Sequence, residues 1–278
     1  IVPIYDFNSS KSGNLYFTMK EIKGRTLKQV MRSVHEASDE NTWKNAPDGW
    51  NLRRLISAFH SVCETMSYAH SKGVIHCDLK PDNIMLGDYG EVLVVDWGIA
   101  KVISQDGILD SENERVQTTR SLLGYTDKGE DISGTPAYMS PEQIWEDMSK
   151  IDQRSDIYTL GLILYEILTG VRFFKGTVTK IFGKKRTTSK SLPVPKPLDD
   201  VINQPEINNE NTEVFLATIN NQLRDIEIKR SQMLDELKES KKNIPKELIR
   251  IYTKAIEKDP KNRYQKTTEL AKDILDWL

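Results

Sequence analysis

The segment HCDLKPDN, residues 76–83, decides the fold of this chain together with the Asp96-Trp97-Gly98 turn that follows it. A strong helical pattern ends just before this segment. Short runs of β-type residues follow it at 84–86 and 92–95, and they are joined by GDYG at 87–90, a hairpin turn signal. The segment therefore lies between a buried helix and a β-hairpin.

Upstream of this segment the sequence predicts two helices and two short strands. Residues 51–73 carry apolar side chains at i, i+3 and i+4 spacing, the pattern of an amphipathic helix. A shorter helix is expected after Thr26, a suitable N-cap, because residues 27–34 keep the same spacing. The alternating runs at 1–7 and 15–22 predict strands, with a turn-forming stretch between them.

Downstream the chain alternates between long polar stretches and helices. Residues 104–133 are polar and mixed, which predicts an exposed loop. Residues 157–168 are apolar nearly all round, as in a helix buried on every side, whereas prolines argue against regular structure across 171–212. Further helices are expected at 216–237, 247–257 and 268–277.

The composition excludes several classes of protein. The 278 residues carry 39 basic and 41 acidic side chains, and the resulting net charge of −2 argues against binding nucleic acid through bulk charge. Two cysteines are too few for a disulfide-stapled secreted scaffold. The longest apolar run, 160–168, falls short of the ~18 residues of a membrane span. We expect a cytoplasmic globular protein with no membrane segment in this chain, while a tether outside it stays open.

Ordered motifs across the whole chain resemble those of the protein kinases. Residues 76–83 and 96–98 are similar to the catalytic loop and the metal-binding turn. GTPAYMSPE (134–142) resembles the substrate-facing loop and its anchor, and DIYTLG (156–161) the start of the central helix. DPKNR (259–263) resembles a late arginine-bearing turn. Two segments, GEVLVVDWGIAK (90–101) and GTPAYMSPEQ (134–143), are similar in sequence to the corresponding segments of bacterial serine/threonine protein kinases.

This resemblance implies a two-lobe α+β fold that is mostly the helical C-lobe. Residues 1–24 would be partial N-lobe strands and the hinge, and 25–278 the C-lobe. Within the C-lobe, 96–142 would form the activation segment and 171–243 an insert.

The resemblance also implies the chemistry, transfer of the ATP γ-phosphate to Ser or Thr hydroxyls of protein substrates. Asp78 would accept the hydroxyl proton as base, and Lys80 would place a cation near the γ-phosphate. Asn83 and Asp96 would hold Mg²⁺, which prefers oxygen ligands. In the family, Lys80 together with Thr135 in the G-T-P loop indicates that serine and threonine, rather than tyrosine, are phosphorylated.

Other family positions concern ATP binding and the framework of the site. The adenine would be bound at Met19, Lys20 and Ile22, with Met85 under the base. Structural rather than catalytic roles are implied for His76 stacked with Trp97, for an ion pair of Glu142 with Arg263, and for the carboxylate of Asp156.

The chain departs from the family pattern at its start. It contains no G-x-G-x-x-G and no V-A-I-K-type lysine before the hinge, so we expect it to begin near the fourth N-lobe strand. Either it is a fragment of a whole kinase or it is a non-catalytic, kinase-like interaction module. The intact Asp78, Lys80, Asn83 and Asp96 favour the fragment. By itself, this chain is expected to bind nucleotide weakly and to show no appreciable transfer.

A second departure is Cys77, which stands where the family commonly has an arginine that receives a phosphate from the activation segment. Because a cysteine cannot do this, phosphate-dependent activation through this pocket is doubtful. The segment offers hydroxyls that could be phosphorylated, although a solvated loop is the simpler interpretation: Thr118, Thr119, Ser121, Thr126 and Ser133.

Two later stretches keep alternative interpretations open. The basic stretch 172–190 could dock an acidic partner or nucleic acid, but a solvated loop is the simpler interpretation. The segment 214–237 has apolar residues at heptad spacing, interrupted by Arg230. It is expected to pack on the C-lobe, with a homodimer or partner contact as the alternative.

Overall fold

The structure is a computed structural model that describes residues 4–10, 15–39, 42–104, 107–108, 136–144, 151–173, 231 and 244–278. Thr135, the candidate phosphorylation sites and the basic stretch beyond Phe173 lie outside these residues. The heptad segment also lies outside them apart from Ser231, so the predictions made for these parts stay predictions.

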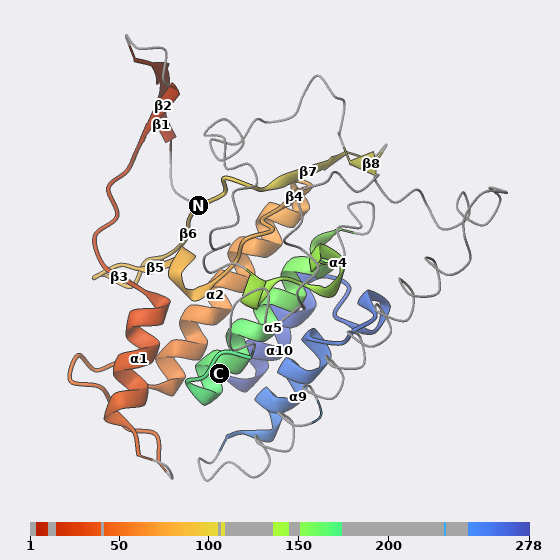
Figure 1. Cartoon of the computed structure of the whole chain (residues 1–278). Helices are drawn as coiled ribbons and strands as arrows, with labels where there is room; N and C mark the ends of the chain where they lie inside the picture. Colours follow the sequence, from red (N-terminus) through yellow and green to blue (C-terminus); the bar gives the residue numbers. More distant parts are fainter. Residues whose placement is uncertain are drawn as a thin grey trace, which may run out of the picture.

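The chain begins with an antiparallel hairpin of β1 (Ile4–Ser9) and β2 (Leu15–Met19), in which Phe7 lies opposite Phe17. Figure 1 shows this hairpin standing away from the helical body. Its aromatic side chains are accordingly exposed, Phe7 by 67% and Phe17 by 47%. Both predicted strands are present, but the second ends at Met19 instead of residue 22.

An irregular segment, residues 20–24, leads from the hairpin to β3 (Arg25–Thr26) and α1 (Leu27–Ala37). Gly24 has φ +136°, and a Cβ there would lie 2.2 Å from the Leu86 carbonyl oxygen, so this close approach requires glycine. Thr26 caps α1 as predicted: its hydroxyl accepts from Gln29 N, and the Gln29 side chain accepts from Thr26 N.

The long helix α2 (Leu52–Ser71) confirms the strongest helical pattern of the sequence. Asn51 is its N-cap and accepts a hydrogen bond from Arg54 N at 3.0 Å. Gly73 follows the helix with φ +72°, in the left-handed conformation that commonly ends helices. The next residues form β4 (Val74–Ile75) and lead directly into the segment 76–83.

The predicted hairpin is also confirmed. β5 (Ile84–Leu86) and β6 (Val92–Val94) pair antiparallel, and β3 lies on the other side of β5. The sequence did not predict β7 (Lys101–Ser104), which pairs with β4 and with β8 (Gly107–Ile108). Its two adjacent apolar residues make no period-two pattern, so the strand depends on pairing with residues far away in the sequence.

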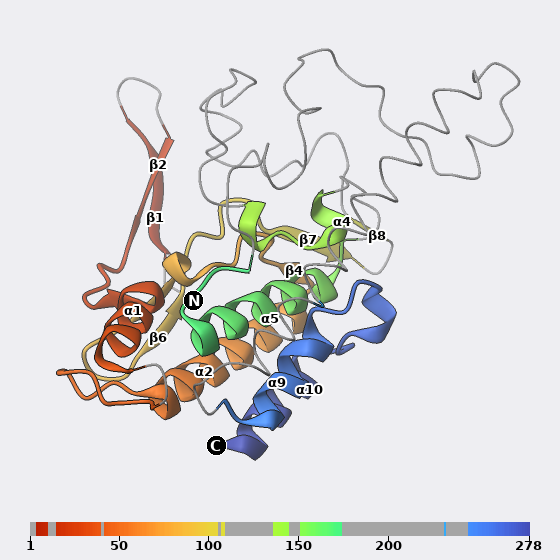
Figure 2. The same ribbon diagram turned by 60° about the horizontal axis from the view of Figure 1, so that its bottom comes forward.

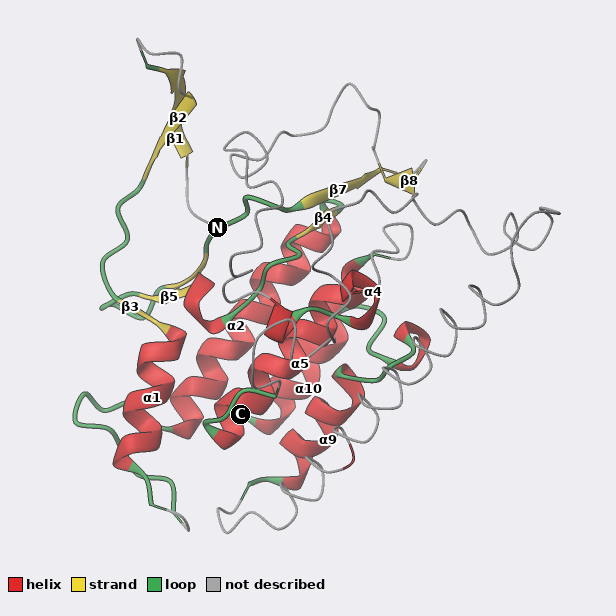
Figure 3. Ribbon diagram, in the orientation of Figure 1, coloured by secondary structure: helices red, strands yellow, loops and turns green. Residues whose placement is uncertain are grey.

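The helical body is built around α5 (Gln153–Thr169), which is buried nearly all round as its sequence predicts. It packs against α2 and against α9 (Lys246–Ala255), while α10 (Thr267–Trp277) packs on α2 (Figure 2). Gly161 makes this close packing possible, because a Cβ there would lie 2.6 Å from Ile256 Cγ2. Helices and small antiparallel sheets together confirm the α+β class (Figure 3).

Short elements complete the described structure: the 3₁₀ turns η1 (Pro81–Asn83), η2 (Pro136–Tyr138) and η5 (Pro260–Asn262), and the helix α4 (Pro141–Ile144). None of the helices in the described ranges is long and apolar enough to cross a membrane.

Candidate active site

Asp78 lies at the centre of the candidate site, in the irregular segment between β4 and η1, and is only 3% exposed. Its Oδ2 atom accepts hydrogen bonds from Lys80 Nζ at 3.0 Å and from Asn83 Nδ2 at 3.4 Å. Its Oδ1 atom is buried and has no hydrogen-bond partner among the described residues. A buried oxygen without a partner is costly, so this atom is available to accept a hydrogen bond from a group outside the described residues.

The β5–β6 hairpin brings Asn83 and Asp96 together, because it begins just after one and ends just before the other. Val95 N donates to Asn83 O at 2.9 Å, and Asn83 Nδ2 lies 3.5 Å from Asp96 Oδ2. Asn83 Nδ2 also donates to the Asp78 carbonyl at 2.9 Å. The Asn83 side chain and the exposed Asp96 carboxylate thus lie side by side, with the Asn83 amide nitrogen facing the carboxylate. Both side chains carry oxygen atoms, the ligand type that Mg²⁺ prefers.

His76 and Trp97 pack beneath this turn, with ring centroids 4.5 Å apart. His76 Nε2 lies 3.1 Å from Val95 O, and the Trp97 indole N–H donates to Val94 O at 3.0 Å. Burial lowers the pKa of the His76 imidazole, so the ring is neutral near pH 7. The contacts of the two rings with the Val94 and Val95 carbonyls hold the backbone just before Asp96.

Asp156, in the first turn of α5, holds the backbone just before Asp78. Its two carboxylate oxygens accept from His76 N at 2.8 Å and from Cys77 N at 3.0 Å. His70, at the end of α2, adds a further contact, since its Nε2 lies 2.8 Å from Asp156 Oδ2 and its Nδ1 lies 2.8 Å from Thr267 Oγ1. The sequence analysis missed His70, because nothing in the α2 pattern points to partners in α5 and α10.

Cys77 adopts a left-handed conformation with φ +66°, uncommon for a residue with a side chain. Its side chain is 7% exposed and packs in a small apolar cluster with Ile75 and Ile151. Burial, aided by the nearby Asp156 carboxylate, raises the pKa of the Cys77 thiol to about 12. The position therefore holds a neutral thiol in apolar surroundings.

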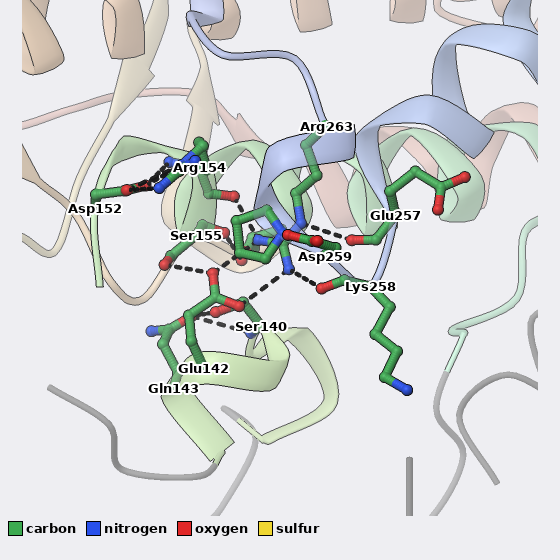
Figure 4. Close-up of polar contacts among 12 residues, drawn as sticks. Ser140, Glu142, Gln143, Asp152, Arg154, Ser155, Glu257, Lys258, Asp259 and Arg263 are labelled. Atoms are coloured by element: carbon green, nitrogen blue, oxygen red, sulfur yellow. Dashed lines mark hydrogen bonds and ion pairs between the residues drawn. The ribbon is translucent and has the colours of Figure 1, made fainter. Parts of the chain in front are cut away.

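The ion pair of Glu142 with Arg263 joins α4 to the turn before α10 (Figure 4). Arg263 Nη1 donates to Glu142 Oε1 at 2.7 Å, Nη2 donates to Oε2 at 3.0 Å, and the guanidinium is completely buried. Burial alone would raise the pKa of the Glu142 carboxyl, but Arg263 and the Ser155 hydroxyl outweigh it and hold that pKa below its usual range.

The residues expected to bind adenine are less closely gathered. Met85 lies half-buried on β5, opposite Thr26 of β3. Met19 ends β2 with 51% of its surface exposed, and Lys20 and Ile22 lie in the irregular segment that comes next. Their role stays a prediction.

One further buried carboxylate, that of Glu166, was not anticipated. The hydroxyl of Tyr138, in η2, donates to Glu166 of α5, and burial raises the pKa of the Glu166 carboxyl. Nearby, Lys28 Nζ pairs with the Asp82 carboxylate of η1 at 2.9 Å. The sequence signals the Tyr138–Glu166 contact only through Glu166 itself, an acidic residue in the otherwise apolar stretch 157–168.

Comparisons with known proteins agree with this geometry. The chain matches the family described as "Protein kinase domain" over residues 1–275. It is 40% identical over 172 residues to the serine/threonine-protein kinase PknD of Protochlamydia amoebophila, and 37% identical over 171 residues to that of Chlamydia felis. These matches cover 61% of this chain but only 17% and 18% of the relatives, so the chain spans a small part of their length.

Proposed function

Because this chain belongs to the protein kinase family, we propose that it carries the phosphoryl-transfer site of a serine/threonine protein kinase. The observation that supports this most is the state of Asp78. One of its oxygens is held by Lys80 and Asn83, while the other is buried without a partner in the described part of the chain. That second oxygen would accept the hydrogen bond, and then the proton, of the attacking Ser or Thr hydroxyl.

The remaining charged groups fit the needs of this reaction. Lys80 Nζ, held beside the Asp78 carboxylate, would lie near the transferred phosphate and offset its negative charge. Asn83 and Asp96 would hold Mg²⁺, which would supply positive charge to offset the charge of the transferred phosphate. In the described residues no group of three or more His, Cys, Asp and Glu side chains could hold a metal, and kinase magnesium sites draw further ligands from phosphates.

The substrate class follows from the same proposal. We propose protein Ser and Thr hydroxyls as acceptors, with Thr135 acting beside Asp78 and Lys80, and adenine bound around Met19, Lys20, Ile22 and Met85. The framework residues would keep the reacting groups in place: His76, Trp97, Glu142, Asp156 and Arg263.

The test separates binding from turnover by two matched substitutions in the full-length protein. Asp78→Asn should abolish transfer but leave the dissociation constant for Mg²⁺·ATP unchanged, because Asp78 positions the hydroxyl and not the metal. Asp96→Asn should weaken Mg²⁺·ATP binding itself, because it removes a charged ligand. Binding is measured by titration with a fluorescent ATP analogue, and transfer by phosphate incorporation into a Ser/Thr protein substrate.

The alternative, a non-catalytic interaction module, predicts another result. Wild type and Asp78→Asn would then be equally inactive, while both still bound a protein partner. Loss of nucleotide binding in Asp78→Asn, with full binding in Asp96→Asn, would contradict the proposed division of roles.

A further inference from the structure

Gln143, in α4, has both ends of its side-chain amide engaged, and Figure 4 shows the end that faces Ser140. Its oxygen accepts from Ser140 N at 3.0 Å and from Ser140 Oγ at 3.1 Å, which is the capping arrangement of a helix start. Its NH₂ group donates to the Cys77 carbonyl at 2.8 Å, across 66 residues of sequence. One side chain therefore connects the start of α4 to the residue immediately before Asp78.

The Cys77 carbonyl occupies a critical position, because it belongs to the peptide unit whose nitrogen is that of Asp78. The Cys77 backbone is left-handed, a conformation that persists only when its surroundings enforce it. Asp156 holds the N–H groups of His76 and Cys77, and His76 Nδ1 lies 3.2 Å from Asp78 N. These contacts fix the nitrogens of the segment, and Gln143 fixes the intervening carbonyl oxygen.

We propose that Gln143 is a positioning residue for phosphoryl transfer. By holding the Cys77 carbonyl, it maintains the left-handed turn and so sets where the unpartnered Oδ1 of Asp78 points. Without this donor, the Cys77 carbonyl, in a largely buried residue, loses a hydrogen bond and the turn can relax. This inference rests on the proposed kinase function. It means that α4 contacts the peptide unit that carries the proposed catalytic residue Asp78.

The connection does not depend on a phosphate. In the described part of the chain, the Cys77 side chain lies in an apolar cluster with Ile75 and Ile151. The backbone N–H of Cys77 is held by the Asp156 carboxylate of α5, and its carbonyl by the Gln143 amide of α4. Gln143 thus provides the link between the end of the activation segment and the catalytic segment at the place where the usual arginine is missing.

Gln143→Glu is the substitution that separates the two halves of this arrangement. A carboxylate at 143 still accepts from Ser140 N and Oγ, so the helix cap remains, but it has no proton to donate to the Cys77 carbonyl. Ser140→Ala is the matched control, because it weakens the cap and leaves the donor of Gln143 in place. Both variants are made in the full-length protein, and Asp78→Asn marks the level of an inactive enzyme.

For Gln143→Glu we expect kcat to fall about ten- to a hundredfold, as for a misplaced catalytic group, while KM for ATP stays within about twofold. Ser140→Ala should keep kcat within about twofold of wild type. Hydrogen exchange, followed by mass spectrometry, should accelerate at the amides of residues 76–78 in Gln143→Glu and stay unchanged in α5. This second readout does not require activity.

The inference would be overturned, while the kinase function stands, by an active wild type with an equally active Gln143→Glu. Faster exchange throughout α5 and α9 would also overturn it, because it would show general destabilisation. If wild type transfers no phosphate, the proposed function fails and this inference fails with it. A loss of kcat in Ser140→Ala equal to that in Gln143→Glu would also overturn it, because the cap alone would then explain the effect.

Discussion

Replacing Arg263 by methionine should destabilise the helical body strongly, because this side chain bonds to several separate segments. Besides Glu142, its guanidinium donates to the carbonyls of Arg154, Glu257 and Lys258 at 2.6–3.0 Å. Arg263→Met fills similar space but leaves the buried Glu142 carboxylate without its counter-charge. Breaking a buried pair from one side costs about 3–5 kcal/mol, which corresponds to a lower Tm by roughly 6–20 °C for a chain of this size.

The assay is urea unfolding of wild type, Arg263→Met, Glu142→Gln and the double variant. Since both residues act in one network, the double variant should lose less than the sum of the single losses, by about 1–3 kcal/mol. Arg32→Met is the control, because Arg32 forms an exposed pair with Glu36 and its loss should leave the unfolding midpoint unchanged. A loss below about 1 kcal/mol in Arg263→Met, or strict additivity, would refute the reasoning.

Three further predictions concern the activation segment, Cys77 and acid stability. Alanine at Thr118, Thr119 and Ser121 together should leave kcat/KM of the full-length protein within a few-fold in a transfer assay, and loss of all activity would show that another basic group receives a phosphate. The Cys77 thiol should react with a maleimide only on unfolding, as followed by mass spectrometry, because it is buried with a pKa raised to about 12; rapid labelling of the folded protein would contradict this. The folded-state pKa of Glu142 is lowered, so its stabilising contribution should be fully present above the ordinary carboxyl pKa and be lost as pH falls through the lowered folded-state pKa. The difference in unfolding free energy between wild type and Glu142→Gln should therefore shrink when it is measured from pH 7 down to about pH 3. A difference that stays constant over this range would contradict the prediction.

The sequence predicted those parts of the fold whose signal is local. The spacing in α2, the all-round apolar pattern of α5 and the GDYG turn of the β5–β6 hairpin each follow from neighbouring residues. β7 could not be found in this way, because it exists through pairing with β4, a two-residue strand nearly thirty positions earlier. The end of β2 at Met19 is likewise set by pairing, since Met19 lies opposite Ile4 at the start of β1, whereas the alternating pattern runs on to residue 22.

For the candidate site, the sequence offered candidates for the catalytic groups but gave no sign of the residues that hold them in place. Asp78, Asn83 and Asp96 were singled out because residues 76–83 and 96–98 resemble the catalytic loop and metal-binding turn of the protein kinases. His70 and Gln143 were missed, because their partners lie 86 and 66 residues away. Only one half of the Gln143 arrangement has a sequence signal, the S-x-x-Q pattern of a capping box at 140–143.

The measurement that tests the central claim most directly is transfer from γ-labelled ATP by the full-length protein, followed by identification of the labelled amino acids. We predict phosphoserine and phosphothreonine on a protein substrate for wild type, and no label above background for Asp78→Asn with unchanged ATP binding. Equal absence of label in both proteins, with partner binding intact, would contradict the claim that Asp78 and its neighbours form a catalytic site.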